Sequence, residues 1–77
     1  MSPEDEQYYE QYLSMFLHTG WKQFVEEAED LLDSQNIDDI KDEKELHLLQ
    51  GQRKTLLSIV NFEVGIKNAL DMESEND

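Results

Sequence analysis

The chain has 77 residues, no cysteine and a formal net charge of -13, which comes from 19 acidic and 6 basic side chains. A chain of this length forms one small domain, for which a single hydrophobic core is barely sufficient. The charge argues against direct binding to nucleic acid or to an anionic membrane, because both require a surplus of lysine and arginine. Without cysteine, the chain forms no disulfide and has no thiolate metal site or cysteine nucleophile.

The composition nevertheless predicts a folded chain. Leu, Ile, Val and Phe supply 20 of the 77 residues, which is about 26% and above the roughly 20% that indicates disorder. No apolar run approaches the roughly 18 residues that span a bilayer, and no charged-then-apolar leader is present. We expect a single soluble domain over residues 1–77, with frayed ends at 1–4 and 72–77.

The first predicted element is an amphipathic helix over residues 4–17. Pro3 suits a first helical turn, and the acidic residues that follow it favour the positive end of the helix dipole. A bend is then expected at 18–20, with Thr19 as the N-cap of the next helix. Apolar side chains of the first helix recur with three- and four-residue spacing: Tyr9, Tyr12, Leu13, Phe16 and Leu17.

The second predicted helix has the clearest apolar stripe in the chain. The stripe consists of Trp21, Phe24, Val25, Ala28, Leu31 and Leu32. The opposite face is acidic, with Glu26, Glu27, Glu29, Asp30 and Asp33. The periodicity ends at the turn-forming residues Ser34 and Asn36, and an acidic loop follows.

The last predicted element is one long helix from about Asp42 to about Asp71. Asp42 is a start signal, because Glu45 follows it at the spacing of a capping box. Gly51 lies inside this helix, where glycine costs about 1 kcal/mol relative to alanine, and it predicts close approach of a partner helix or of the Trp21 ring. Its first stripe consists of Leu46, Leu49, Arg53, Leu56, Leu57, Val60 and Val64. A second stripe begins late, at Ile59, Phe62, Ile66, Ala69 and Leu70.

The widening of the apolar surface in this long helix predicts that its second half is covered on several sides. The cover would come from both earlier helices or from another copy of the chain. Together the elements predict an all-α fold, which is a helical hairpin or a three-helix unit: a short helix, a bend, a second helix, an acidic loop and a long C-terminal helix.

The charge is distributed unevenly. Residues 26–45 hold ten acidic side chains and two lysines, a net charge of -8, whereas residues 46–70 hold three basic side chains and one acidic side chain, a net charge of +2. The acidic block is expected to steer basic partners and to oppose self-association through its own face. We therefore expect a homo-oligomer to use the long helix.

No pattern in the chain predicts chemistry. His18 and His47 lack the spacing of a metal motif, and we interpret both as structural or solvent-facing. The acidic run 38–43 lacks the order of a calcium loop, and the carboxylates lie on solvated faces where nothing raises their pKa. We predict no enzyme, no cofactor, and no catalytic, cofactor-binding or metal-binding residue.

The aromatic residues are unevenly distributed, because five of the seven lie within residues 8–21. They predict either a core stripe with one or two exposed tyrosines or a binding face, since Tyr and Trp are enriched at interface hot spots. Helical steps of 100° spread the three tyrosines apart, so at least one is expected to be exposed. The candidate partner-binding residues are Tyr8, Tyr9, Tyr12, Ile59, Phe62, Ile66 and Leu70.

Several short strings carry a resemblance to a known group of proteins. They are Tyr8-Tyr9, Met15-Phe16, Thr19-Gly20-Trp21-Lys22 with Phe24, Glu45-Leu46-His47, Gln50-Gly51-Gln52 and Ile59-Val60-Asn61-Phe62-Glu63. With these strings, the chain resembles small acidic proteins encoded by short-tailed, podovirus-type phages, notably marine ones, over most of residues 8–71. The resemblance implies a phage protein that accompanies portal, head or tail assembly, and it supplies no site residue.

We therefore expect a non-enzymatic phage structural or assembly-accessory protein in the virion or the host cytoplasm. It would bind virion subunits or copies of itself through an apolar helix face and form a homo-oligomer, with no direct contact to nucleic acid or membrane. The alternative is an acidic inhibitor that imitates the charge of DNA and binds a host nucleic-acid-binding protein. Binding by a mimic would weaken steeply with salt, whereas an apolar contact would tolerate salt.

Overall fold

The computed structural model describes the backbone of residues 1–76 and the side chains of residues 1–75. This part of the chain contains no strand, so the predicted all-α class is confirmed. The elements are α1 (Pro3–Phe16), α2 (Thr19–Ser34), the 3-10 helix η1 (Ile37–Asp39), α3 (Glu43–Val60) and α4 (Phe62–Asn76).

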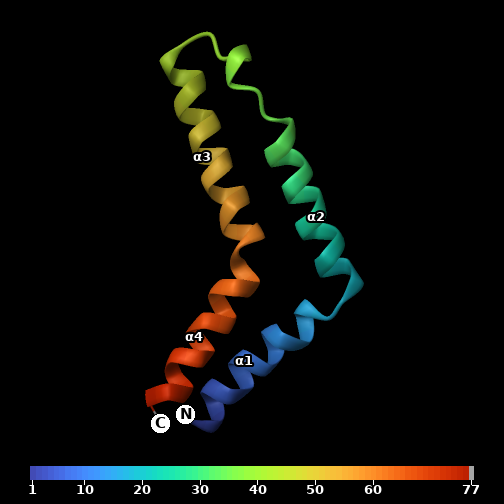
Figure 1. Ribbon diagram of the computed structural model, residues 1–77, viewed down its shortest axis with the longest axis vertical. Helices are drawn as coiled ribbons and strands as arrows, with labels where there is room; N and C mark the ends of the chain where they lie inside the picture. The colour runs from blue at the N-terminus through green and yellow to red at the C-terminus, as the bar shows by residue number, and fades with distance from the viewer. Residues whose placement is uncertain (77) are drawn as a thin grey trace.

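The fold is a hairpin with two bent arms (Figure 1). α2 packs along α3 and α1 packs along α4, while the segment around η1 joins the arms at the end opposite both termini. The molecule measures 51 × 27 × 16 Å and has a radius of gyration of 16.6 Å, whereas a compact domain of this length has about 11.5 Å. The described helices therefore form one thin layer, and none covers its broad faces.

The bend in the first arm lies slightly earlier than expected. α1 ends when the N–H groups of Leu17 and His18 donate to the carbonyls of Ser14 (3.2 Å) and Met15 (3.0 Å). His18 has an extended backbone (φ -72°, ψ 137°) and is the N-cap of α2, without a side-chain capping bond. The prediction of Thr19 as the N-cap is wrong, because the extended residue that leads the chain out of α1 is His18 and Thr19 is already helical.

The long helix that the sequence predicts is divided at Asn61, whose backbone (φ -94°, ψ 2°) leaves the helical region. Asn61 is hydrogen-bonded to both helices, because its N–H donates to the Leu57 carbonyl (2.9 Å) and its carbonyl accepts from the Gly65 N–H (3.0 Å). The prediction of an uninterrupted helix is therefore wrong. Neither proline nor glycine stands at the bend, and Phe62, the residue directly after it, packs against three rings of the other arm.

Local capping fixes two of the helix starts. Asp42 is confirmed as the N-cap of α3, because its Oδ1 accepts a hydrogen bond from the Glu45 N–H at 2.8 Å. The Glu45 Oε2 in turn accepts from the N–H of Lys41 at 2.8 Å, one residue before the cap. At the start of α1, the Ser2 hydroxyl accepts from the Asp5 N–H at 3.1 Å.

The first and last helices extend closer to the ends of the chain than expected. Ser2 caps α1, which begins at Pro3, and α4 continues to Asn76 instead of ending near Asp71. The helix is thus longer than predicted by five residues, the fraying of 1–4 and 72–77 stays a prediction, and Asp77 lies outside the described residues.

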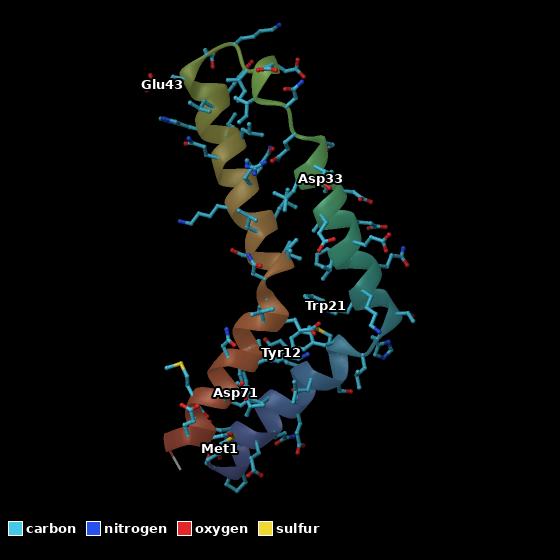
Figure 2. All side chains as sticks on the ribbon, in the orientation of Figure 1. Met1, Tyr12, Trp21, Asp33, Glu43 and Asp71 are labelled. Atoms are coloured by element: carbon cyan, nitrogen blue, oxygen red, sulfur yellow. The ribbon has the colours of Figure 1, made fainter. Side chains whose placement is uncertain are left out.

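The core is small and is centred on the two bends, beside which Tyr12 and Trp21 lie (Figure 2). Phe62 contacts three rings, with centroid distances of 5.1 Å to Tyr12 and 6.0 Å to both Phe16 and Trp21. We call Tyr12, Phe16, Trp21 and Phe62 the aromatic cluster. The buried residues of the described chain are Tyr9, Phe16 and Ala28.

Gly51 does not serve the purpose that the sequence predicts. A Cβ placed at Gly51 would meet no atom within 4 Å, so neither a helix of the same subunit nor the Trp21 ring approaches it closely. The prediction of close packing at Gly51 within the subunit is wrong because the helix turns this position toward an open surface.

Candidate protein-binding surface

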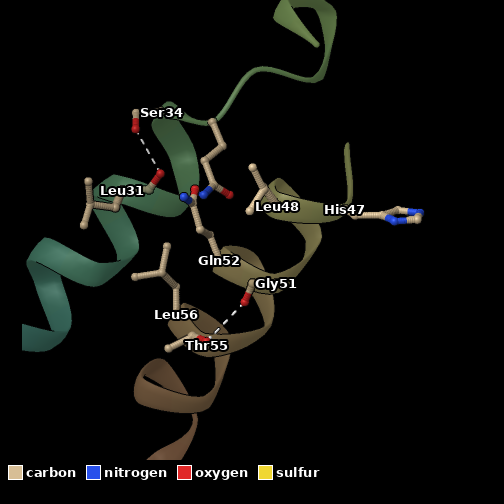
Figure 3. A pocket seen from close by; sticks show the side chains of 9 residues that line it. Leu31, Ser34, His47, Leu48, Gly51, Gln52, Thr55 and Leu56 are labelled. Carbon is tan, nitrogen blue, oxygen red and sulfur yellow. Dashed lines mark hydrogen bonds between the residues drawn. The ribbon is translucent and has the colours of Figure 1, made fainter. Parts of the chain in front are cut away.

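An uncovered groove of about 670 Å³ runs between α2 and α3. In Figure 3, Leu31 and Leu48 stand on opposite sides of the groove, and Gly51 and Thr55 lie along the α3 side. We call this surface the leucine groove. It is lined by Leu31, Ser34, Gln35, His47, Leu48, Gly51, Gln52, Thr55 and Leu56.

The spacing of residues within each helix places these side chains together. Leu48, Gln52 and Leu56 follow one another at intervals of four, and Thr55 lies three residues after Gln52, so these side chains lie on one side of α3. On the opposite side, Leu31 and its neighbours come from the last turn of α2. The groove therefore follows directly from the side-by-side packing of the two helices.

Hydroxyl groups in the leucine groove are already bonded to their own helices. The Ser34 hydroxyl donates to the Leu31 carbonyl at 2.9 Å, and the Thr55 hydroxyl donates to the Gly51 carbonyl at 3.1 Å. Hydroxyls with satisfied bonds present little unmet polarity to a partner. The two hydroxyls therefore add little polarity to the groove, whose other polar lining residues are Gln35, which accepts a hydrogen bond from the Arg53 guanidinium at 3.3 Å, His47 and Gln52.

The rims of the leucine groove are unusually exposed for large apolar side chains. Leu31 is 56% exposed and Leu48 is 60% exposed. No aspartate, glutamate, lysine or arginine lines the groove. A contiguous exposed apolar surface of this kind is characteristic of an interaction site.

A second, smaller hollow adjoins the groove and shares Thr55 with it. It is lined by Trp21, Thr55, Ser58, Ile59 and Phe62 and also contains no charged residue. The uncharged surface therefore extends along α3 from Leu48 to the aromatic cluster.

A hollow on another part of the hairpin has the opposite character. It is lined by the apolar residues Trp21, Val25 and Val60 together with the charged residues Lys22, Glu26, Glu29 and Glu63. Charged residues also adjoin the leucine groove at one end, where a hollow that shares His47 and Leu48 with it is lined by Glu43 and Lys44.

Glu63 links the aromatic cluster to α4. Its carboxylate accepts hydrogen bonds from the Lys67 ammonium at 2.8 Å and from the Trp21 indole N–H at 3.4 Å. The bond from Lys67 is the main cause that holds the pKa of Glu63 below its ordinary value, and it outweighs the opposite effect of burial. The charged carboxylate thereby helps to orient Trp21.

Tyr9 links the free ends of the two arms. It is 7% exposed, and burial raises the pKa of its hydroxyl above the ordinary 10.0. The carboxylate of Glu73 in α4 raises this pKa further, through its negative charge and a side-chain hydrogen bond. Tyr9 therefore contributes to the contact between α1 and α4 in its protonated form.

The predicted partner-binding residues are distributed over several places. Tyr8 is 52% exposed, whereas Tyr9 is buried. Ile59 and Phe62 meet in the hollow beside the leucine groove. The remaining three residues are half-buried: Tyr12 in the aromatic cluster, Ile66 in α4, and Leu70 in a hollow that also contains Tyr9.

Sequence reasoning missed the two leucines at the rims of the groove. Leu31 has the spacing of a core residue, but the single layer of helices leaves it exposed. Leu48 belongs to neither apolar stripe of the predicted long helix. This position could have identified it, because an apolar residue outside the stripes of a helix is not covered by its own subunit.

The described residues contain no recognisable metal site. No group of three or more His, Cys, Asp or Glu side chains among them could hold a metal ion. His18 is exposed at the start of α2, and the His47 ring extends outward from α3, away from the two leucines (Figure 3). Of the helices described, none is long and apolar enough to cross a membrane.

In comparisons with known proteins, no family model, no curated protein and no solved structure matches the chain.

Proposed function

We propose that the chain is a non-enzymatic protein-binding subunit, which takes part in assembly by placing the leucine groove against another protein. The observation that carries this proposal is the exposure of Leu31 and Leu48 on the rims of an uncharged groove. Apolar side chains of a partner helix could fill such a groove, as in helix-in-groove recognition.

The proposed setting is the assembly of a phage particle, with the chain in the virion or the host cytoplasm. The similarity of its short sequence strings to small acidic proteins of short-tailed phages supports this setting. Peptide mass spectrometry of purified particles of the virus would test it, and absence of the chain from particles would contradict a virion location.

Site-specific photocrosslinking tests the proposed binding surface. A photoreactive amino acid replaces Leu48 in one variant and Leu57 in the other. Both are exposed leucines of α3 (60% and 43%), and nine residues of helix at 100° each direct them to opposite sides. We expect a protein adduct from position 48 and little from position 57. Equal yields at both positions, or no adduct at either, would contradict the proposal.

The outer face of α2 favours a second candidate function, the imitation of DNA. No ion pair connects this face to a lysine or arginine within the described residues, so its charge remains available to a basic partner. A host nucleic-acid-binding protein would then be the target, and its affinity would fall steeply with salt. The exposed acidic residues of this face are Glu26, Glu27, Glu29, Asp30 and Asp33.

A further inference from the structure

We infer that the leucine groove is occupied by a second copy of this chain, so that two hairpins pair through their uncharged faces as a homodimer. The inference rests on the proposed protein-binding function and goes further by naming the partner. Three independent features support it: the surface area of the subunit, the distribution of charge, and the shape of the groove.

The subunit exposes more surface than a compact protein of its size. Its accessible surface is 6172 Å² for a mass of 9.1 kDa, whereas a compact monomer of this mass exposes about 4,900 Å². The surplus of about 1,300 Å² exceeds the roughly 800 Å² that each partner buries in a standard interface. Pairing of two hairpins can therefore remove the surplus without any further partner.

The charge of the chain restricts which surface two copies can share. Two chains with a net charge of -13 repel each other, and the repulsion is strongest where acidic faces approach. The leucine groove and the hollow beside it carry no charged side chain. Two copies that meet through these hollows bring no charged lining residue of either hollow against the other copy.

The groove is also suited to pair with itself. Leu31 and Leu48 project from its two rims, and Gly51, which has open space above it, lies in the α3 wall. In a two-fold arrangement, each contact occurs twice with the roles of the copies exchanged. A rim leucine of each copy then enters the groove of the other, where the absence of a side chain at Gly51 leaves room for it.

Analytical ultracentrifugation of the full chain tests this inference. The variants Leu48→Glu and Leu31→Glu place a carboxylate on either rim, and Leu57→Glu is the matched control on the far side of α3. All three positions are at least 43% exposed, so circular dichroism is expected to show an intact fold in each. We expect a dimer for the original chain, with dimerisation weakened at least about tenfold by each rim variant and changed less than about twofold by the control.

Salt provides a second measurement with a definite sign. Added sodium chloride screens the repulsion between two acidic chains, so we expect the dimer to become tighter as salt rises. Binding to a basic partner through the acidic face of α2 would respond in the opposite direction.

Several outcomes would overturn the inference. These are a monomer at every concentration and salt level, a dimer that dissociates as salt rises, and equal weakening by Leu48→Glu and Leu57→Glu. A monomeric chain whose position 48 still crosslinks to a different protein in cells would remove the self-association and leave the proposed binding function intact. Failure of both experiments would remove both.

Discussion

The ring of Phe62, the first residue of α4, stands edge-on to the ring of Tyr12 in α1, with 5.1 Å between the ring centroids and 76° between the planes. This geometry is favourable for aromatic pairs. Because Phe62 also contacts Phe16 and Trp21, one side chain connects both segments of the first arm to the bend of the second. The contacts of the Phe62 ring therefore hold the bend of one arm against the bend of the other.

Removal of the Phe62 ring is expected to destabilise the hairpin more than any other single truncation in α4. Phe62→Ala should lower the free energy of unfolding by about 3 kcal/mol, since it leaves three rings without their common neighbour. Urea unfolding followed by circular dichroism measures the change, at one protein concentration because association also affects stability. The control is Val64→Ala, which truncates a 59% exposed residue two positions later and should cost at most about 0.5 kcal/mol. Equal costs for the two variants would contradict the central role of Phe62.

The N-cap of α3 offers a test that depends only on local structure. Asp42→Ala removes the acceptor for the Glu45 N–H and should cost about 1 kcal/mol, while Asp42→Asn should keep most of the stability. Asp39→Ala is the matched control, because it also removes one negative charge from the loop, and its side chain caps no helix. Thermal unfolding compares the three variants, and a cost for Asp39→Ala as large as that for Asp42→Ala would argue against capping.

The ion pair of Glu63 predicts a dependence of stability on acid pH. The pKa of Glu63 in the folded chain lies below its ordinary 4.5, so its contribution is complete above that pH and is lost as the pH falls through the folded value. The difference in unfolding midpoint between the original chain and Glu63→Gln should therefore decrease continuously as the pH falls below 4.5. A difference that stays constant to the lowest pH at which the chain folds would exclude this origin.

Tyr9 predicts the opposite behaviour at alkaline pH. Burial and Glu73 raise its pKa above 10.0, so the folded chain holds the proton more tightly than the unfolded chain, and stability falls as the pH rises beyond 10. Ultraviolet absorbance of ionised tyrosine, in a variant with Tyr8→Phe and Tyr12→Phe, follows Tyr9 alone. Adding Glu73→Gln should lower the pKa of Tyr9 only part of the way to 10.0, because burial is the larger cause and remains.

Gly65 offers a stabilising substitution. It lies inside α4, and a Cβ at this position would meet no atom within 4 Å. Gly65→Ala should therefore raise the free energy of unfolding by about 0.8 kcal/mol, the difference in helix propensity. Chemical denaturation provides the measurement, and a loss of stability would indicate that this face of α4 has a partner that alanine obstructs.

Much of the secondary structure could be predicted because it depends on neighbouring residues. The cap at Asp42 and the proline at the start of α1 act over three or four residues, and the structure confirms both. The prediction of Thr19 as the N-cap was wrong because α2 could begin after either His18 or Thr19. Which of the two residues is extended depends on the direction in which the chain leaves α1.

The candidate surface could be predicted only in part. Ile59 was identified because it belongs to the second stripe of the long helix, and it lines the uncharged surface beside Thr55. Leu31 was assigned to the core because its spacing matches that of Ala28, which is buried. Spacing along one helix cannot show that Ala28 is buried and Leu31 is exposed, because the exposure of each depends on how far the second arm reaches around α2.

The sequence by itself determined that the chain is helical, where α3 begins, and how its charge divides between an acidic block and a nearly neutral last part. These properties follow from hydrogen bonds and side-chain preferences between residues a few positions apart. The tertiary structure alone decided the bend at Asn61 and the exposure of Leu31 and Leu48. Both depend on the other arm: Phe62 turns toward rings that lie more than forty positions earlier in the sequence, and a single layer of helices leaves one side of each helix without a neighbour.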